Sequence, residues 1–159
     1  MKIASVRAVR TVGCPAAAAQ GYAEDFLASF ERGEIAAVVR AGPLAHLVRL
    51  EFGLSSFSDG MGPRRDELRI AWSALTPLLP DFRGTIQVRS HAGRTELLLA
   101  GKYAPPGGRA GVLFDRIIGN AIAAATARDV LRRLALQIEA RNDVWTLRVT
   151  AAAARETPA

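Results

Sequence analysis

Residues 82–103, FRGTIQVRSHAGRTELLLAGKY, decide the fold of this chain because they contain two strand-like runs around Ala92-Gly93. In each run apolar and polar residues alternate, and the dipeptide between them suits a tight turn. A turn at this point sets a register in which one face of the hairpin is apolar and the other carries a pair of opposite charges. The facing pairs are Ser90 with Thr95, Arg89 with Glu96, Val88 with Leu97, Ile86 with Leu99, Gly84 with Gly101, and Phe82 with Tyr103.

A corner and a long helix follow the hairpin. The corner is the segment GKYAPPGGRAG at 101–111, whose prolines interrupt regular structure and whose glycines permit sharp turns. Apolar residues then recur at spacings of three and four over 109–141. This spacing predicts one helix of roughly 45 Å, at 1.5 Å per residue, that covers the apolar face of the sheet. We expect Asn142-Asp143 to end the helix.

The remaining segments supply further strands and one more helix. Alternating patterns predict a strand at 2–12 and a hairpin formed by 46–54 and 66–74, and Pro15 favours a helix over 15–32. Residues 34–40 fit either a short helix or a strand. Trp145, Leu147 and Val149 alternate with polar residues, which predicts a last strand at 144–150. We expect a single domain over 1–150, followed by a frayed tail at 151–159.

Composition excludes several classes of function. The net charge of +6 comes from scattered arginines, and few residues are aromatic, so we expect no nucleic-acid partner. No apolar run is long enough to span a membrane, and the first residues do not resemble a signal peptide. Cys14 is the only cysteine, which fits a reducing compartment and a cytoplasmic location, and we expect it to be a small buried residue.

Cofactor and metal sites are not predicted. His46 and His91 do not form a ligand spacing with Cys14, so we expect no metal. The corner sequence GGRAG lacks the lysine and hydroxyl residue that end a nucleotide-binding loop, so no cofactor is expected there.

The chain resembles the START-like superfamily, also called SRPBCC, which includes the Bet v 1-like proteins. The resemblance covers roughly residues 3–140. It is carried by Pro80, Phe82, Gly84, Leu97, Leu99, Gly101, Tyr103, Pro105, Pro106, Gly111, Asp115, Ala123, Ala125 and Thr126. It implies an α+β helix-grip fold, in which a curved antiparallel sheet wraps around a long C-terminal helix and encloses a hydrophobic cavity.

One feature of the sequence departs from this resemblance. The resemblance implies six strands between the first helices and the long helix, whereas the alternating patterns there identify four. Residues 144–150 are therefore expected either to pair with the first strand or to exchange with a second chain.

The leading functional hypothesis is a binding protein for a hydrophobic or amphipathic small molecule, such as a lipid or a polyketide-like or aromatic compound. The small residues Gly84 and Gly101 either leave space for such a ligand or allow close packing. The candidate cavity residues are Leu50, Phe52, Ile70, Trp72, Ile86, Val88, Leu97, Leu99, Tyr103, Phe114, Ile118 and Ile122.

Two alternatives remain open at this stage. The first is an enzyme of the polyketide cyclase, aromatase or dehydratase type, with Tyr103, Asp115 and Arg116 as the candidate catalytic groups near the mouth of the cavity. No base with a convincing partner is visible in the sequence, so enzyme activity is left undecided. The second is an interaction module without a pocket, which forms a homodimer through 144–150.

Overall fold

The computed structural model describes residues 4–28, 34–41, 44–57, 65–74, 81–104 and 120–155. The elements in these ranges are β1 (Ala4–Val12), α1 (Ala16–Ala28), β2 (Glu34–Ala41), β3 (Leu44–Phe57), β4 (Arg65–Ala74), β5 (Asp81–His91), β6 (Arg94–Ala104) and α3 (Asn120–Arg155).

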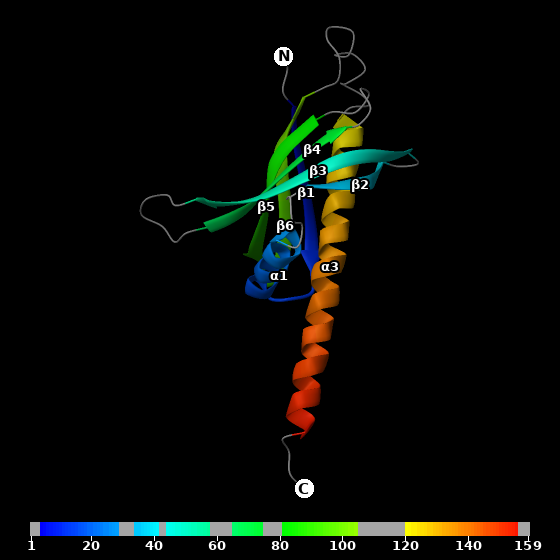
Figure 1. The fold of residues 1–159 in the computed structure, drawn as a ribbon. Coiled ribbons are helices and arrows are strands. Elements are labelled where there is room, and N and C mark those ends of the chain that lie inside the picture. The colour runs from blue at the N-terminus through cyan, green and yellow to red at the C-terminus, as the bar shows by residue number, and fades with distance from the viewer. Residues whose placement is uncertain are drawn as a thin grey trace.

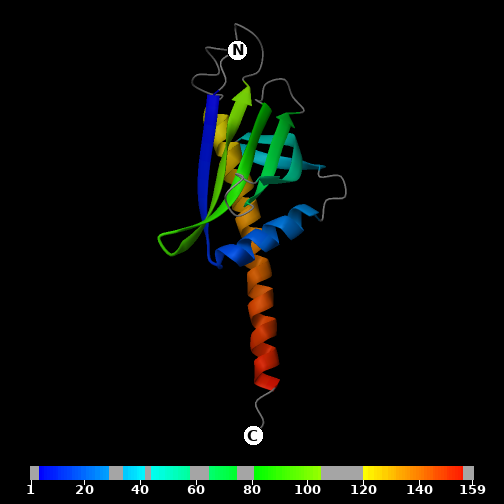
Figure 2. The same ribbon diagram turned by 90° about the vertical axis from the view of Figure 1, so that its left-hand side faces the viewer.

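The described strands form one antiparallel sheet in the order β1-β6-β5-β4-β3-β2. The first strand therefore pairs with the last, and β1 and β2 are the two edges. Helix α3 runs along one face of the sheet, and α1 lies across α3 near one end of the strands (Figures 1 and 2). The upper half of α3 packs against β1 and β2, so the helix joins the two edges of the curved sheet.

The hairpin of β5 and β6 has the register that the sequence predicts. Phe82 faces Tyr103, Gly84 faces Gly101, and Arg89 faces Glu96, along with the other expected pairs. The turn residues Ala92 and Gly93 have φ angles of 49° and 74°. Two consecutive positive φ angles are typical of the turns whose twist matches that of the flanking strands.

Two other predictions about strands are settled by the structure. Residues 34–40, which fitted either a helix or a strand, belong to β2 and pair with β3. The described residues include five strands between α1 and α3, one more than the four patterns that we identified there, and β1 completes the sheet of six.

The prediction of a last strand at 144–150 is wrong. These residues continue α3, which runs through Asn142-Asp143 and ends at Arg155. They neither pair with β1, whose described partner is β6, nor supply a strand that a second chain could take up. At 1.5 Å per residue the 36 residues of α3 span about 54 Å, so the helix extends well beyond the sheet (Figure 1).

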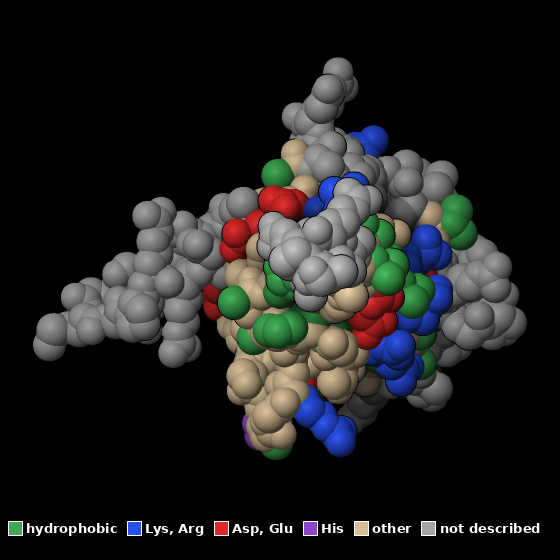
Figure 3. All heavy atoms as spheres, turned by 90° about the horizontal axis from the view of Figure 1, so that it is seen from below, with side chains coloured by type: hydrophobic (Ala, Val, Ile, Leu, Met, Phe, Trp, Pro, Cys, Tyr) green, Lys and Arg blue, Asp and Glu red, His purple; other side chains and the backbone are tan. Residues whose placement is uncertain are grey.

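Burial along α3 changes abruptly at the end of the sheet. Leu131, Leu134 and Ile138 are buried against the domain, whereas every residue from 143 to 150 is exposed. Hydrophobic side chains surround the end of the helix in the view from below, with charged side chains beside them (Figure 3). Among the described residues, no helix is both long and apolar enough to cross a membrane.

Candidate functional site

The inner face of the sheet is a continuous apolar surface. In the register of the strands, the residues that face α3 form rows across the sheet. One row contains Tyr103, Phe82, Trp72 and Leu50, which are all at most 4 % exposed. Such rows arise because every second residue of each strand is apolar and neighbouring strands are in phase.

Most of the residues proposed to line a cavity come together on this face. Phe114 and Ile118 lie outside the described residues. Seven others belong to the buried core, and three are half-buried and pack against it. The buried residues are Leu50, Ile70, Trp72, Ile86, Leu97, Leu99 and Tyr103, and the half-buried ones are Phe52, Val88 and Ile122.

The two facing glycines allow close packing at the centre of the sheet. A Cβ atom added to Gly84 or to Gly101 would lie within 3.0 Å of the Cζ atom of Phe82, and also of neighbouring backbone. The Phe82 ring therefore occupies the space that side chains at these two positions would need. Of the two interpretations of these glycines, the structure favours close packing.

Half-buried apolar side chains border the core on several elements. Tyr22 and Phe26 come from α1, Phe52 from β3, Val88 from β5 and Ile122 from α3. Because they are only partly covered, these side chains form the boundary between the apolar interior and the solvent.

The candidate catalytic groups cannot be assembled into one site from the described residues. Tyr103 is 2 % exposed and points inward within the row of aromatic side chains. Asp115 and Arg116 lie outside the described residues. No three His, Cys, Asp or Glu side chains come together in the part of the chain that the structure describes.

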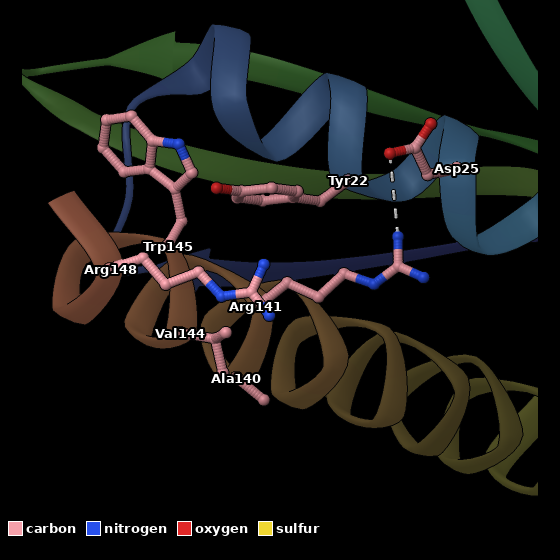
Figure 4. Close-up of a pocket in the computed structure, with 7 residues that line it drawn as sticks. All are labelled: Tyr22, Asp25, Ala140, Arg141, Val144, Trp145 and Arg148. Atoms are coloured by element: carbon pink, nitrogen blue, oxygen red, sulfur yellow. Dashed lines mark ion pairs between the residues drawn. The ribbon is translucent and has the colours of Figure 1, made fainter. Parts of the chain in front are cut away.

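A cleft that the sequence did not predict lies between α1 and residues 139–155 of α3 (Figure 4). We call these residues the projecting part of α3. The volume of the cleft is about 390 Å³. Trp145 and Tyr22 form its apolar sides, and Arg141 makes an ion pair with Asp25 at 3.8 Å across it. The wrong assignment of 144–150 to a strand hid this cleft, because Trp145 was placed on a sheet instead of beside α1.

A buried carboxylate attaches α3 to one edge of the sheet. Asp129 is 7 % exposed and pairs with Arg132 at 2.7 Å and with Arg133 at 3.0 Å. The Nη2 group of Arg133 also donates a hydrogen bond to the backbone carbonyl of Val38 on β2 at 2.6 Å. Because β2 is an edge strand, this bond satisfies a carbonyl that would otherwise be open to pairing with another strand.

The comparison with solved structures identifies the fold. No protein-family model matches the chain, and no curated protein matches it. The crystal structure of TTHA0849 from Thermus thermophilus is 16 % identical to this chain, with a TM-score of 0.50. The match covers 87 % of this chain and 99 % of TTHA0849.

Two more distant similarities are to Ara h 8.0201 and to the Zhui aromatase/cyclase from Streptomyces sp. R1128. Ara h 8.0201 is 10 % identical with a TM-score of 0.41, and the match covers 88 % of this chain and 97 % of that one. The Zhui enzyme is 16 % identical with a TM-score of 0.35, and the match covers 89 % of each chain. The order of the elements, the curved antiparallel sheet and the long C-terminal helix together show that this chain has the START-like, helix-grip fold.

Proposed function

We propose that this chain binds a hydrophobic or amphipathic small molecule, of lipid, polyketide-like or aromatic type, between the inner face of the sheet and α3. The observation that carries the proposal is the continuous apolar face of the sheet, which α3 covers by contacting the two edge strands while α1 packs against β3, β5 and β6. A ligand held there would be removed from water along most of its surface, which is the main source of affinity for an apolar molecule.

The half-buried residues provide the entry for the ligand in this proposal. Ile122 on α3 and Phe52 on β3 are partly exposed and pack against the edge of the buried core. Side chains at such a border change rotamer at little cost, because they are not packed on all sides. A ligand can therefore displace them without breaking the core around Phe82.

Uptake of a fluorescent fatty acid by the purified protein tests this proposal. We expect saturable binding of one equivalent, and native mass spectrometry of gently purified protein should show the bound mass directly. In Ile122→Trp the larger side chain occupies the entry, and we expect the affinity to fall at least tenfold, which is about 1.4 kcal/mol.

Lys102→Trp is the matched control. Lys102 lies on β6, is exposed and points away from the inner face, so the same bulky residue there leaves the interior unchanged. Absence of uptake in the unmodified protein contradicts the proposal. Equal loss of uptake in both variants also contradicts it, because binding would then take place on the outer surface.

Catalysis in the same space is the alternative to binding alone. Tyr103 is the one candidate catalytic group that the described residues place on the inner face. Its hydroxyl can position or protonate an oxygen of a bound molecule, whereas the two other candidates, Asp115 and Arg116, lie outside the described residues. We therefore propose binding as the function, and a cytoplasmic location remains part of this proposal.

A further inference from the structure

The projecting part of α3 carries an apolar stripe that nothing in the described chain covers. Val144 and Leu147 are 51 % and 70 % exposed, and Ala140, one turn before Val144, is exposed as well. From position 140 the apolar residues recur at alternating spacings of four and three, through 144, 147, 151 and 154. This is the spacing of the seam residues in a coiled coil.

The stripe lies on a side of α3 that the sheet does not cover. At 3.6 residues per turn, Leu147 lies about 140–180° around the helix axis from Leu134 and Ile138, which are buried against the sheet, and Val144 lies about 80–120° from them. A partner helix centred on the stripe would therefore approach from outside the domain and leave the sheet in place.

The stripe also leaves α1 in place. Trp145 lies on the side of α1, where it lines the cleft with Tyr22. Ala140 and Val144 border the same cleft, but their side chains point away from Tyr22 (Figure 4). A second helix can therefore cover Ala140 and Val144 without entering the space between Trp145 and α1.

The charged residues beside the stripe favour a second copy of the same helix as the partner, in parallel orientation. Asp143 precedes the seam residue Val144, and Arg148 follows the seam residue Leu147. In a parallel pair, these positions, five residues apart, face each other across the two helices. Two identical helices in parallel would therefore form two pairs between Asp143 and Arg148 of the opposite chain.

An antiparallel pair is disfavoured by the same charges. In that arrangement Arg141 and Arg148 of one helix would face the equivalent arginines of the other, and like charges would oppose association. The alternative stripe on the other side, through Trp145 and Val149, is flanked by these arginines without a carboxylate in the facing position.

We propose that the projecting half of α3 pairs in parallel with the same segment of a second copy of this chain. The pairing is a two-fold symmetric interface in which Val144 and Leu147 form the apolar seam and Asp143 and Arg148 form the flanking ion pairs. It differs from the dimer that the sequence suggested, because a helix and not a strand makes the contact. It also does not depend on the proposed binding of a small molecule.

Analytical ultracentrifugation of the full chain, from micromolar to near-millimolar concentration, tests the seam. We expect a reversible monomer–dimer equilibrium in the unmodified protein and a monomer in Leu147→Asp, since burying a carboxylate at the seam is costly. Val149→Asp is the control on the same helix. Val149 is 47 % exposed but lies off the stripe, so its variant should dimerise as the unmodified protein does.

Charge exchange tests the direction of the pairing. Asp143→Arg alone and Arg148→Asp alone should each weaken the dimer about tenfold at low salt, because each places like charges opposite one another twice. The double variant restores opposite charges and should return to within about threefold of the unmodified protein. In a Cys14→Ala background, Leu147→Cys should oxidise to a disulfide-linked dimer, because a parallel seam places the two copies of position 147 side by side.

Three results would overturn the proposal. The first is a chain that stays monomeric at every concentration, which would assign the stripe to a different partner. The second is a double charge variant that remains as weak as the single variants. The third is a Val149→Asp variant that dissociates as fully as Leu147→Asp, which would place the contact on the opposite side of the helix. Circular dichroism of each variant shows whether its helix content equals that of the unmodified protein.

Discussion

The rings of Trp72 and Phe82 stack face to face across β4 and β5, with their centroids 3.8 Å apart and their planes inclined by 10°. This stacking fixes the Phe82 ring above the neighbouring glycines of β5 and β6, Gly84 and Gly101. The stacked aromatic pair and the two facing glycines of β5 and β6 are therefore one packing unit. Any ligand space on this face has to lie beside this unit.

The glycine at position 84 should not tolerate a methyl group. In Gly84→Ala the new Cβ would approach both Phe82 and the backbone of β6, so we expect a loss of about 2 kcal/mol or more in the free energy of unfolding. Urea denaturation followed by tryptophan fluorescence measures this loss. Gly53→Ala is the control, because the nearest atom to its added Cβ is 3.9 Å away. Equal stability of the two variants would contradict the packing described for Phe82.

Ala92 is a position where a substitution should stabilise the protein. Its φ angle of 49° is unfavourable for alanine and is common for asparagine. We expect Ala92→Asn to raise the free energy of unfolding by about 0.5–1 kcal/mol, and Ala92→Val to lower it. Thermal unfolding of the three proteins gives the order. A less stable asparagine variant would show that the turn is not formed as described.

The ion pairs of Asp129 should contribute measurably to stability, unlike those of an exposed carboxylate. Asp129→Asn keeps the shape of the side chain but removes the charge that faces Arg132 and Arg133, and we expect a loss of about 1–2 kcal/mol. Glu51→Gln, at an exposed position on β3, should change stability by less than about 0.5 kcal/mol. Denaturant unfolding in low and high salt distinguishes a partly buried pair from a screened one.

The thiol of Cys14 should react slowly with alkylating reagents. Burial raises its pKa above the ordinary value of 9.0, and the negative charge of Glu139 raises it further. A raised pKa means less thiolate at any given pH below it, so the rate at pH 8 should be lower than that of a free thiol and should increase as the pH rises.

Glu139→Gln separates the two causes of this slow reaction. Removal of the charge lowers the pKa of Cys14, so alkylation at pH 8 should become faster while the protein stays folded. Glu139 also accepts a hydrogen bond from the backbone N–H of Gly13 at 3.3 Å, which the glutamine side chain can still accept. An unchanged rate would show that burial alone controls the reactivity.

The β5–β6 hairpin was predictable because the pattern within each strand and the pairing between the two strands indicate the same register. The apolar alternation of both strands, the charges at Arg89 and Glu96 and the turn at Ala92-Gly93 all require the same register. The inner-face residues of β3 and β4 were predictable for the same reason. Their apolar residues recur with a period of two, and these residues are buried on the inner face.

The end of α3 was not predictable from the same kind of pattern. Trp145, Leu147 and Val149 alternate as in a strand, but in the helix they lie on different sides, and all three are exposed. Asn142 and Asp143 have only modestly low helix propensity, which continuation of an established helix overcomes easily. Two apolar stripes on one helix can produce an alternating sequence, so the cleft beside α1 and the projecting segment both required the structure.

Helix α3 packs against β1 and β2 in its first half and is exposed at residues 143–150, without a break between the two parts. A continuous helix transmits rotation and translation along its axis, so a change in its position against β1 and β2 displaces the exposed residues beyond the sheet. If a molecule in the interior shifts α3, the association of the projecting ends changes by a definite coupling free energy. By thermodynamic linkage, association would then alter the affinity of the interior by the same factor.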